Sequence, residues 1–252
     1  MLDLQKANIG KRISALLCDI IILSILAVGF TFFMSWVTNY DKYNADLSAC
    51  YAKYEEEFGV KFEITTEEYE AKTPEEKAQY DAAFEALSKD EEAVYNYNMV
   101  INLTLVILSV SILVSYICAE FLIPMWLKHG RTVGKKVFGL AVMRVDGVKI
   151  NNLQLFARTF VGKYAIQTMI PIYIIVMIYN NAIGIVGPIV LLGILILNLV
   201  SYFVSKTRSA IHDVFAGTVV VDYSSQLIFS TEEELVEYKK KLAAERAERS
   251  PY

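Results

Sequence analysis

Two carboxylates stand inside long apolar stretches of this sequence. Asp19 interrupts the run from Ile13 to Val37, and Glu120 is the one acid between Met99 and Leu127. Placing an ionisable group in hydrocarbon is costly, so such a residue is a functional-site candidate by default. Carboxylates in this setting exchange cations and protons, or they pair with basic side chains and hold helices together. The sequence therefore predicts a polar cluster that serves either transport or structure.

The two acids should lie at similar depth and need cationic partners. Asp19 is seven residues beyond Arg12, about 10 Å along a helix, and Glu120 is eight residues before Lys128. Arg is the better partner, because its planar fork holds a carboxylate with two hydrogen bonds. We predict that Arg12 has this role. The wider set of basic candidates is Arg12, Arg131, Arg158, Lys163 and Arg208.

A third acid follows the last apolar run, in "KTRSAIHDVFAGT". His212 beside Asp213 could titrate near neutral pH, although such a pair is more often structural. The other histidine, His129, has no ligand partners at helical spacing, so we predict no metal site and no cofactor. The sequence also lacks a nucleophile elbow and an HExxH motif, and we predict no enzymatic activity. The predicted polar cluster comprises Arg12, Asp19, Glu120, Arg208 and Asp213.

The stretch "GRTVGKKVFGL" resembles a phosphate-binding loop but fails its spacing. A P-loop needs four residues between its first glycine and its Gly-Lys, whereas three separate Gly130 from Gly134, and Lys136 occupies the hydroxyl position. We predict an interfacial element, with Val133, Val137, Phe138 and Leu140 on the bilayer and Arg131, Lys135 and Lys136 at anionic head groups. The interfacial loop comprises Gly130, Arg131, Thr132, Gly134, Lys135, Lys136 and Gly139.

The elements that position these residues are long apolar helices. Hydrophobic residues make up 55% of the chain and its mean hydropathy is +0.38. A membrane-spanning helix needs about 20 mostly apolar residues. Such runs extend from Ile13 to Val37, from Met99 to Leu127, from Phe160 to Tyr179 and from Ile183 to Val204. The sequence therefore predicts four transmembrane helices.

The charges orient these helices. Residues 41–92 carry six Lys and sixteen Asp or Glu, a net charge of −10, whereas residues 128–163 carry eight Lys or Arg and one acid. Basic loops face the cytoplasm. We expect a multi-pass protein of the cell (inner or plasma) membrane, with both termini and the basic loop in the cytoplasm. Topology accounts for the basic residues, so we expect no nucleic-acid partner.

Residues 38–98 predict a helical insertion outside the membrane. Apolar and aromatic residues from Tyr40 to Phe58 recur every three or four positions, which predicts that the first helix continues until Gly59. Three N-terminal capping signatures follow, namely Thr65 with Glu68, Thr73 with Glu76, and Ser88 with Glu91. The charge runs favour a solvated decoration over a ligand-binding domain.

Short β-rich segments lie on the basic side. Asp146-Gly147 is a hairpin turn signal between two β-rich runs. The run from Thr218 to Val221 could pair with the β-rich run that precedes this turn. The tail from Thr231 predicts a solvated helix. The expected fold is an all-α membrane protein with four transmembrane helices, an extracytoplasmic helical insertion and a small cytoplasmic β-ribbon. Its segments are 1–37 (first span), 38–98 (insertion), 99–127 (second span), 128–159 (Gly/Lys loop and hairpin), 160–205 (third and fourth spans) and 206–252 (Arg/His-Asp segment and charged tail).

Three stretches together resemble the RDD family of bacterial membrane proteins, named for one Arg and two Asp. They are "KRISALLCD", "AEFLIPMWLKHGRTVGKKVFGLAVMRVDG" and "RSAIHDVFAGTVVV". The resemblance implies Arg12 and Asp19 as the first pair and Asp213 as the last acid, and it places Gly130, Thr132, Gly134, Lys135 and Gly139 in the family's glycine-rich loop. It covers most of the chain except residues 38–98 and the charged tail, and family members usually have a much shorter connection between the first two spans.

Two functions follow. The first, which the family resemblance also suggests, is transport such as cation/proton exchange, with Asp19 and Glu120 as the working carboxylates and Arg12 as their partner. The alternative is a scaffold or accessory protein that transports nothing, in which the same cluster is structural and the insertion binds a protein partner. Four spans are few for a solute pathway unless the protein oligomerises, which favours the scaffold or a dimer. The expected partners are thus the anionic bilayer, further copies of the chain and a protein at the insertion.

Overall fold

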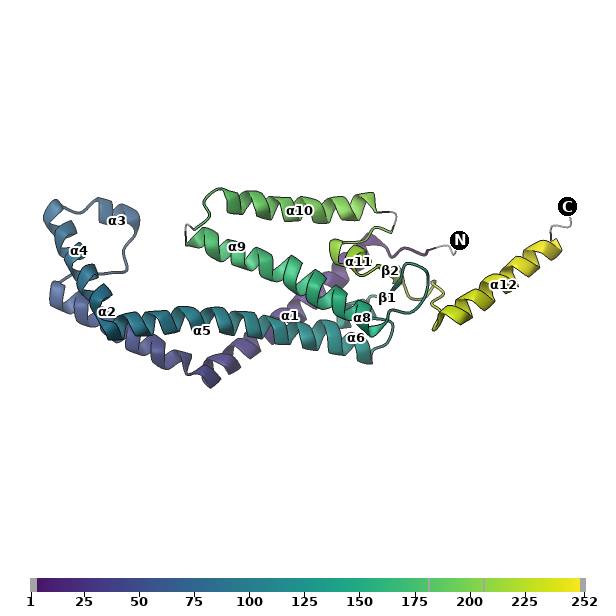
Figure 1. Ribbon diagram of the computed structural model, residues 1–252, viewed down its shortest axis with the longest axis horizontal. Helices are drawn as coiled ribbons and strands as arrows, with labels where there is room; N and C mark the ends of the chain where they lie inside the picture. Colours follow the sequence, from purple (N-terminus) through teal and green to yellow (C-terminus); the bar gives the residue numbers. More distant parts are fainter. Residues whose placement is uncertain (1–3, 181, 206, 250–252) are drawn as a thin grey trace. The chain divides into compact units, whose positions relative to one another are not determined.

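The computed structural model describes residues 4–180, 182–205 and 207–249, which form two compact units (Figure 1). Unit 1 comprises residues 1–27 and 113–252, and unit 2 comprises residues 28–112. The elements in chain order are α1 (Ile9–Thr38), α2 (Tyr40–Phe58), α3 (Thr66–Glu70), α4 (Pro74–Lys89), α5 (Glu91–Tyr116), η1 (Ile117–Leu122), α6 (Ile123–Trp126), α7 (Val133–Val137), β1 (Leu140–Arg144), α8 (Asn152–Phe156), η2 (Ala157–Met169), α9 (Ile170–Tyr179), α10 (Val186–Val204), α11 (Ile211–Phe215), β2 (Thr218–Asp222) and α12 (Glu232–Arg249). The symbol η marks a π-helical segment.

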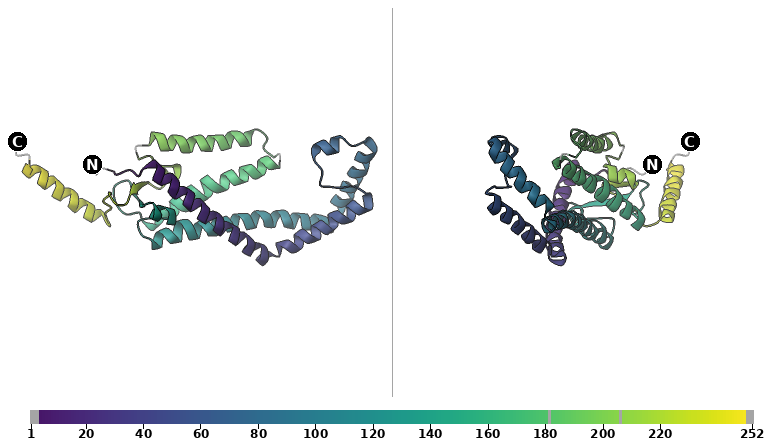
Figure 2. Two further views of the ribbon diagram at one scale, coloured as in Figure 1. Left: turned by 180° about the vertical axis from the view of Figure 1, so that it is seen from behind. Right: turned by 60° about the vertical axis from the view of Figure 1, so that its left-hand side comes forward.

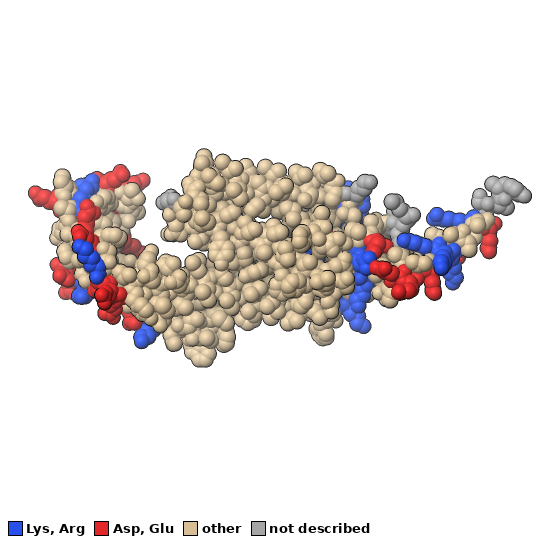
Figure 3. Space-filling view, in the orientation of Figure 1, with Lys and Arg blue, Asp and Glu red and all other residues tan. Residues whose placement is uncertain are grey.

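Four of the described helices are long and apolar enough to cross a membrane. They extend over Ile9–Thr38, Glu91–Trp126, Asn152–Tyr179 and Val186–Val204. The second combines α5, η1 and α6, and the third combines α8, η2 and α9. Over α9 and α10 the visible face of unit 1 carries no charged side chain (Figure 3). The four predicted spans are therefore confirmed in length and composition.

A two-stranded antiparallel sheet, the ribbon, is the only sheet among the described residues. Strands β1 and β2 pair in a register from Leu140 opposite Asp222 to Arg144 opposite Thr218. The predicted pairing of these two distant segments is confirmed. The expected hairpin after β1 forms but is short, with one antiparallel bridge between Met143 and Lys149, and Lys149 N donates to Phe229 O at 2.8 Å.

The ribbon is buried on both faces, which fixes the first turns of α1. One face packs against Ala7 and Ala15 of the N-terminal region, and the other packs against Leu4 and Ile228. Residue 6 also forms an isolated bridge with Val221 of β2, and the N-terminal segment lies beside the ribbon in both Figure 1 and Figure 2. The alternating inward residues are Leu140, Val142 and Val220 on the first face and Ala141, Met143, Val219 and Val221 on the second.

Helices α9 and α10 run antiparallel, side by side (Figures 1 and 2). Their contact depends on a glycine, because a Cβ at Gly187 would lie 2.5 Å from Cγ1 of Ile178. Small residues permit such close helix contacts in membranes. This pair brings the C-terminal turns of α10 to the same end of unit 1 as the ribbon.

In unit 2 the first helix does not continue to Gly59 as predicted. Asn39 adopts the left-handed conformation, with φ 53°, and separates α1 from α2. Asn tolerates this conformation better than other residues with a side chain, so a helical apolar pattern can continue across the break. Gly59, with φ 63°, ends α2 as expected.

The capping signatures of the insertion are mostly confirmed. Thr65 and Thr73 form complete capping boxes with Glu68 and Glu76. The third prediction is wrong, since Asp90 and not Ser88 begins α5. Its Oδ1 accepts from the backbone N–H groups of residues 92 and 93 at 2.9 and 3.2 Å. The carboxylate of Asp90 lies two residues nearer to α5 than the hydroxyl of Ser88, which is the weaker acceptor, and so it caps the helix instead.

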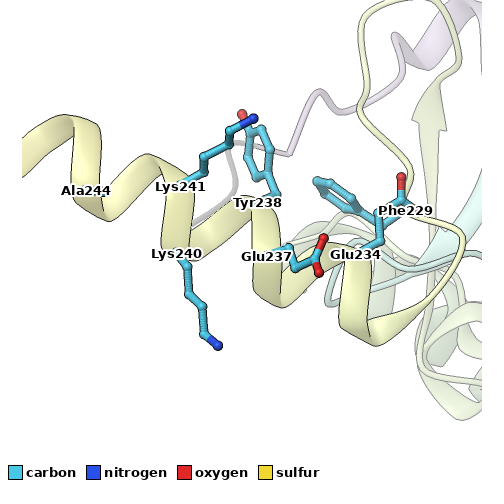
Figure 4. Close-up of a pocket in the computed structure, with 7 residues that line it drawn as sticks. All are labelled: Phe229, Glu234, Glu237, Tyr238, Lys240, Lys241 and Ala244. Atoms are coloured by element: carbon cyan, nitrogen blue, oxygen red, sulfur yellow. The ribbon is translucent and has the colours of Figure 1, made fainter.

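The C-terminal helix α12 is anchored by its first turns to the loops that follow β1 and β2. Leu235 is buried against Val148 and Phe229, and Figure 4 shows the rings of Phe229 and Tyr238 facing one another, with centroids 5.2 Å apart. The later turns are solvent-exposed and charged, as predicted for the tail. The depression in Figure 4 lies on this exposed helix.

Candidate functional site

Asp19 of α1 is held by the N-terminus of the short helix α7. Its Oδ2 accepts from Thr132 Oγ1 at 2.5 Å and from Lys135 Nζ at 3.4 Å, and its Oδ1 accepts from the backbone N–H of Gly134 at 2.8 Å. Thr132 also caps α7, because its Oγ1 accepts from the backbone N–H of Lys135. A carboxylate at a helix N-terminus gains from the exposed N–H groups and the helix dipole.

This arrangement explains the glycine-rich loop. A Cβ on Gly134 would lie 2.3 Å from the carbonyl oxygen of Ala15 and 2.8 Å from Asp19 Oδ1. Only glycine allows α7 to approach α1 so closely. The loop therefore does hold an anion, as its resemblance to a phosphate-binding loop suggests, but the anion is the chain's own carboxylate.

Glu120 pairs with Lys163 across two π-helical segments. The Lys163 Nζ lies 2.6 Å from Glu120 Oε2, and both residues are buried, in η1 and η2 respectively. Pro124 has no N–H to donate to the carbonyl of Glu120 four residues earlier, and Thr159 Oγ1 donates to that carbonyl at 2.9 Å. π-Helical segments are rare and are frequent at functional sites.

Asp213 of α11 pairs with Arg158 of η2. Arg158 Nε donates to Asp213 Oδ1 at 2.7 Å, and Thr218 Oγ1 donates to the same oxygen at 3.0 Å. Burial alone would raise the pKa of Asp213, but the charge of Arg158 outweighs it and the pKa is lowered. The carboxylate is therefore ionised at neutral pH. Gly162 permits this contact between η2 and α11, because a Cβ there would lie 2.5 Å from Cβ of His212.

His212 connects this ion pair to α10 through a chain of hydrogen bonds. Its Nε2 lies 3.2 Å from Arg158 Nη2, and its Nδ1 lies 2.7 Å from Gln167 Oε1. Gln167 Nε2 in turn donates to Asn198 Oδ1 at 2.6 Å. Because Arg158 can only donate, Nε2 must accept and Nδ1 must carry the proton. The ring is therefore neutral, which agrees with the effect of burial, which lowers the pKa of His212 to about 3.

The neutral state of His212 predicts a loss of stability in mild acid. The unfolded chain takes up a proton near pH 6.5 whereas the folded chain resists until about pH 3. Stability is therefore complete above pH 6.5 and falls as the pH decreases, by up to about 1.4 kcal/mol per pH unit. The His212→Gln variant should lack this component, so that between pH 7 and pH 5 it loses about 2 kcal/mol less than wild type.

Chemical unfolding in mild detergent, measured by circular dichroism across this pH range, checks the prediction. The His129→Gln variant keeps His212 and serves as the control, so it should retain the steep decline. Parallel stability curves for wild type and His212→Gln would show that folding leaves the pKa of this ring unchanged, and would contradict the prediction.

The prediction that Arg12 pairs with Asp19 is wrong. Arg12 Nη1 donates to the carbonyl of Arg208 at 2.6 Å, and Nη2 donates to the carbonyl of Val220. Arg12 and Asp19 are two helical turns apart on α1, and the N-terminus of α7 supplies the hydrogen bonds to Asp19 instead. Among the described residues no ion pair includes Arg12 or Arg208, and the Arg208 side chain is exposed.

The prediction of an interfacial loop is wrong for two of its residues. Lys135 is buried beside Asp19 rather than at lipid head groups, and Leu140 is buried in the ribbon rather than on the bilayer. Arg131 lies over the ring of Tyr223, 4.3 Å from its centroid. Lys136 and Val137 are exposed. The two remaining loop glycines, Gly130 and Gly139, adopt positive φ angles of 59° and 67°.

The buried charges balance. Each carboxylate has one charged basic partner, and Asp213 also lies 3.4 Å from Nε2 of the neutral His212. Arg158 also interacts electrostatically with Glu120 and Asp19, so the pairs form one cluster. A buried ion pair that is neutral as a whole avoids the larger cost of an unpaired charge. The three pairs are Asp19 with Lys135, Glu120 with Lys163, and Asp213 with Arg158.

A cavity of about 420 Å³ opens beside this cluster, within unit 1. Its lining includes Tyr202 and Asn198 of α10, whereas Asp19 and Glu120 are not part of the lining that the described residues form. The cavity therefore meets the basic partners of these two acids and not the acids themselves. Its charged and titratable lining residues are Arg12, Lys135, Arg158, Lys163, His212 and Asp213.

Comparison with known proteins identifies the family. The RDD family matches residues 6–217. The chain belongs to the RDD family. Neither the search of curated proteins nor the search of solved structures gave a match. The Arg and two Asp that the family resemblance implies therefore have distinct roles in this RDD protein, since Asp19 and Asp213 accept from basic groups whereas Arg12 binds carbonyls.

Sequence reasoning missed several residues of the cluster. Thr132 and Gly134 appear only as loop residues, although a Thr before a short helix with glycine two positions later is a signal for anion binding at a helix N-terminus. Gln167 and Asn198 are amides inside otherwise apolar runs. A polar side chain in such a run is expected to face the protein interior, which would have placed both residues near the cluster. Within the part of the chain that the structure describes, no group of His, Cys, Asp and Glu could hold a metal ion.

Proposed function

We propose that this RDD family protein is a membrane transport protein that binds an anionic substrate in the cavity of unit 1 and moves it together with a proton. One observation carries the proposal: the cavity is lined by four basic side chains and one acid, from Arg12, Lys135, Arg158, Lys163 and Asp213. Pores and sites for anions are lined by Arg and Lys, and those for cations by Asp and Glu. The lining therefore favours an anion.

The charge balance supports coupling to a proton. The three ion pairs are neutral together and Arg12 compensates one further negative charge, so an anion with two charges, such as succinate at neutral pH, would leave one net negative charge in a region of low dielectric. Uptake of one proton by a paired carboxylate restores neutrality, as intramembrane carboxylates do in proton relays. Glu120 is the natural acceptor, because its partner Lys163 lines the cavity and can turn toward the anion.

The second candidate is cation/proton exchange. It is favoured by the Glu120–Lys163 pair in its π-helical setting, with Nζ 2.6 Å from Oε2. A cation that displaces Lys163 from Glu120 would force the amine to release its proton. The direction of proton movement therefore separates the two candidates, since an anion enters with a proton and a cation enters as a proton leaves.

The sidedness belongs to the same proposal. The ribbon and both termini would face the cytoplasm of a cell membrane, with residues 38–98 outside, because residues 128–163 are basic and residues 41–92 are acidic. Since four spans are few for a solute pathway, we also propose that the working form is a homo-oligomer. No enzymatic activity is proposed.

Proteoliposomes with a trapped pH indicator test the proposal. An inward gradient of an anion, with phosphate and succinate as probes and equal sodium on both sides, should acidify the lumen. An inward sodium gradient with equal anions should leave the pH unchanged. The Lys163→Met and Glu120→Gln variants should each reduce the anion-driven signal by about tenfold or more, and the exposed Lys136→Gln control should not.

Two other outcomes would contradict the proposal. Alkalinisation by the sodium gradient that Glu120→Gln abolishes would establish cation/proton exchange instead. Absence of any ion-driven signal in folded wild-type protein would contradict both transport candidates. It would then favour the scaffold, in which the ion pairs only hold the spans together and the insertion binds a protein partner.

A further inference from the structure

The cavity has charged side chains at its deep wall and apolar side chains at its outer rim. Lys135, Arg158 and Lys163 form its deep wall and are between 1% and 8% exposed. Its outer wall includes Leu199 and Phe203 of α10, which are 50% and 75% exposed. The apolar outer wall also includes Ile9, Ile13 and Leu16 of α1. A freely soluble anion would have to pass this apolar rim, whereas an amphiphile matches both layers.

The rim lies where two membrane spans meet. The first turns of α1 and the last turns of α10 both lie beside α11 in Figures 1 and 2. Both helices are long and apolar enough to cross a membrane. Their exposed apolar side chains therefore face acyl chains, and the rim is accessible from the bilayer.

One positive charge in the lining is not neutralised. Lys135, Arg158 and Lys163 each have a carboxylate partner. Arg12 instead donates to two backbone carbonyls and interacts with Tyr202, and its buried Nε has no hydrogen-bond partner among the described residues. Carbonyl groups do not cancel the charge of a guanidinium. The lining thus has one uncompensated positive charge and one free donor at the same side chain.

We propose that the cavity binds the monoanionic head group of a single-chain membrane amphiphile, with the head group at Arg12 and the acyl chain along the apolar rim between α1 and α10. The inference rests on the proposed function, because it names the class of anion. One excess charge matches one head-group charge, and the free guanidinium donor can form a charge-assisted hydrogen bond with a carboxylate or phosphate. The volume of about 420 Å³ is that of a small-molecule site and has room for one chain.

Direct binding to the detergent-purified full chain tests the inference, with laurate, monolaurin and acetate as probes in isothermal titration calorimetry. Laurate has both the charge and the chain, monolaurin has the chain alone, and acetate has the charge alone. Laurate should bind at least about tenfold more tightly than either of the others. Equal binding of monolaurin would reduce the site to an apolar groove, and equal binding of acetate would make it a site for soluble anions. Either result overturns the inference.

Two matched pairs of variants place the ligand. Arg12→Gln should weaken laurate binding by about tenfold or more, whereas Lys11→Gln, on the same helix but paired with Asp222 outside the cavity, should not. Leu199→Trp fills the rim and should weaken binding similarly. Leu195→Trp, one helical turn away and not part of the lining, should not.

The Leu199→Trp result keeps the inference testable even if Arg12→Gln fails to fold. Unchanged binding in folded Leu199→Trp would overturn it. Laurate binding without any proton-coupled flux would contradict the proposed function alone. Flux of phosphate or succinate by protein that binds no laurate would contradict this inference alone.

Discussion

Replacing Arg158 with methionine is expected to lower the free energy of unfolding of the protein by about 3–5 kcal/mol. Arg158 is 1% exposed, and its Nε lies 2.7 Å from Asp213 Oδ1. Its loss leaves the carboxylate buried without a cationic partner and removes the donor to His212 Nε2. An uncompensated buried charge is among the most destabilising single changes in a folded protein.

The measurement is chemical unfolding in mild detergent at pH 7, compared with Arg144→Met as a control. Arg144 pairs with Glu232 at the same 2.7 Å, but this pair lies at the surface. The control should cost no more than about 1 kcal/mol, because water screens the exposed pair. Equal losses in the two variants would mean that distance rather than burial decides the contribution, and would contradict the expectation.

A double variant separates the pair from its surroundings. Arg158→Met together with Asp213→Leu removes both charges, and should recover much of the stability that Arg158→Met alone loses. Thr218 Oγ1 would keep only its longer contact with the backbone carbonyl of residue 213, at 3.4 Å, so recovery should be incomplete. Together with the single Asp213→Leu variant, the double variant completes a cycle that measures the coupling between the two residues.

The features that follow one-dimensional patterns could be predicted from the sequence. Run length alone identifies the four spans, and a threonine with glutamate three residues later identifies the capping boxes at Thr65 and Thr73. The pairing of β1 with β2 could be anticipated because both are short, mostly apolar runs on the same predicted side of the membrane. Such patterns succeed because the interactions they describe are local, or depend only on average hydrophobicity.

The partners of the buried acids could not be predicted in the same way. Spacing gives the depth of Asp19 along its helix, but not which neighbouring element faces it around the helix axis. Arg12 and Lys135 are both basic, and only the packing of α7 on α1 selects Lys135. The charge on Arg12 then remains for another use, and for this reason we propose an anion rather than a cation as the ligand.

Two local irregularities were also beyond the sequence patterns. The break at Asn39 interrupts no apolar spacing, so periodicity continues across it. The π-helical segments η1 and η2 precede Pro124 and Pro171, and proline disrupts the normal helical hydrogen bonds before it. Proline predicts some irregularity, but not that the resulting π turns would bring Glu120 and Lys163 together.

The second large effect is expected at Gly134, where alanine should destabilise the protein by about 3 kcal/mol. Its Cβ would lie 2.3 Å from the carbonyl oxygen of Ala15, so α7 must move away from α1. Overpacking costs about 1–3 kcal/mol, and stretching the N–H bond to Asp19 costs about 1.5–3 kcal/mol more, against a gain of up to about 1 kcal/mol in helix propensity. Chemical unfolding in mild detergent measures the net loss.

Gly193→Ala in α10 is the matched control, because a Cβ there meets no atom within 4 Å. That variant should be neutral or up to about 1 kcal/mol more stable, since alanine favours a helix over glycine. If Gly134→Ala were equally harmless, α7 could leave Asp19 without cost and the carboxylate would not depend on the helix N-terminus. A loss at Gly134 alone would instead show that the glycine-rich loop is required because it lets a backbone N–H reach a buried carboxylate.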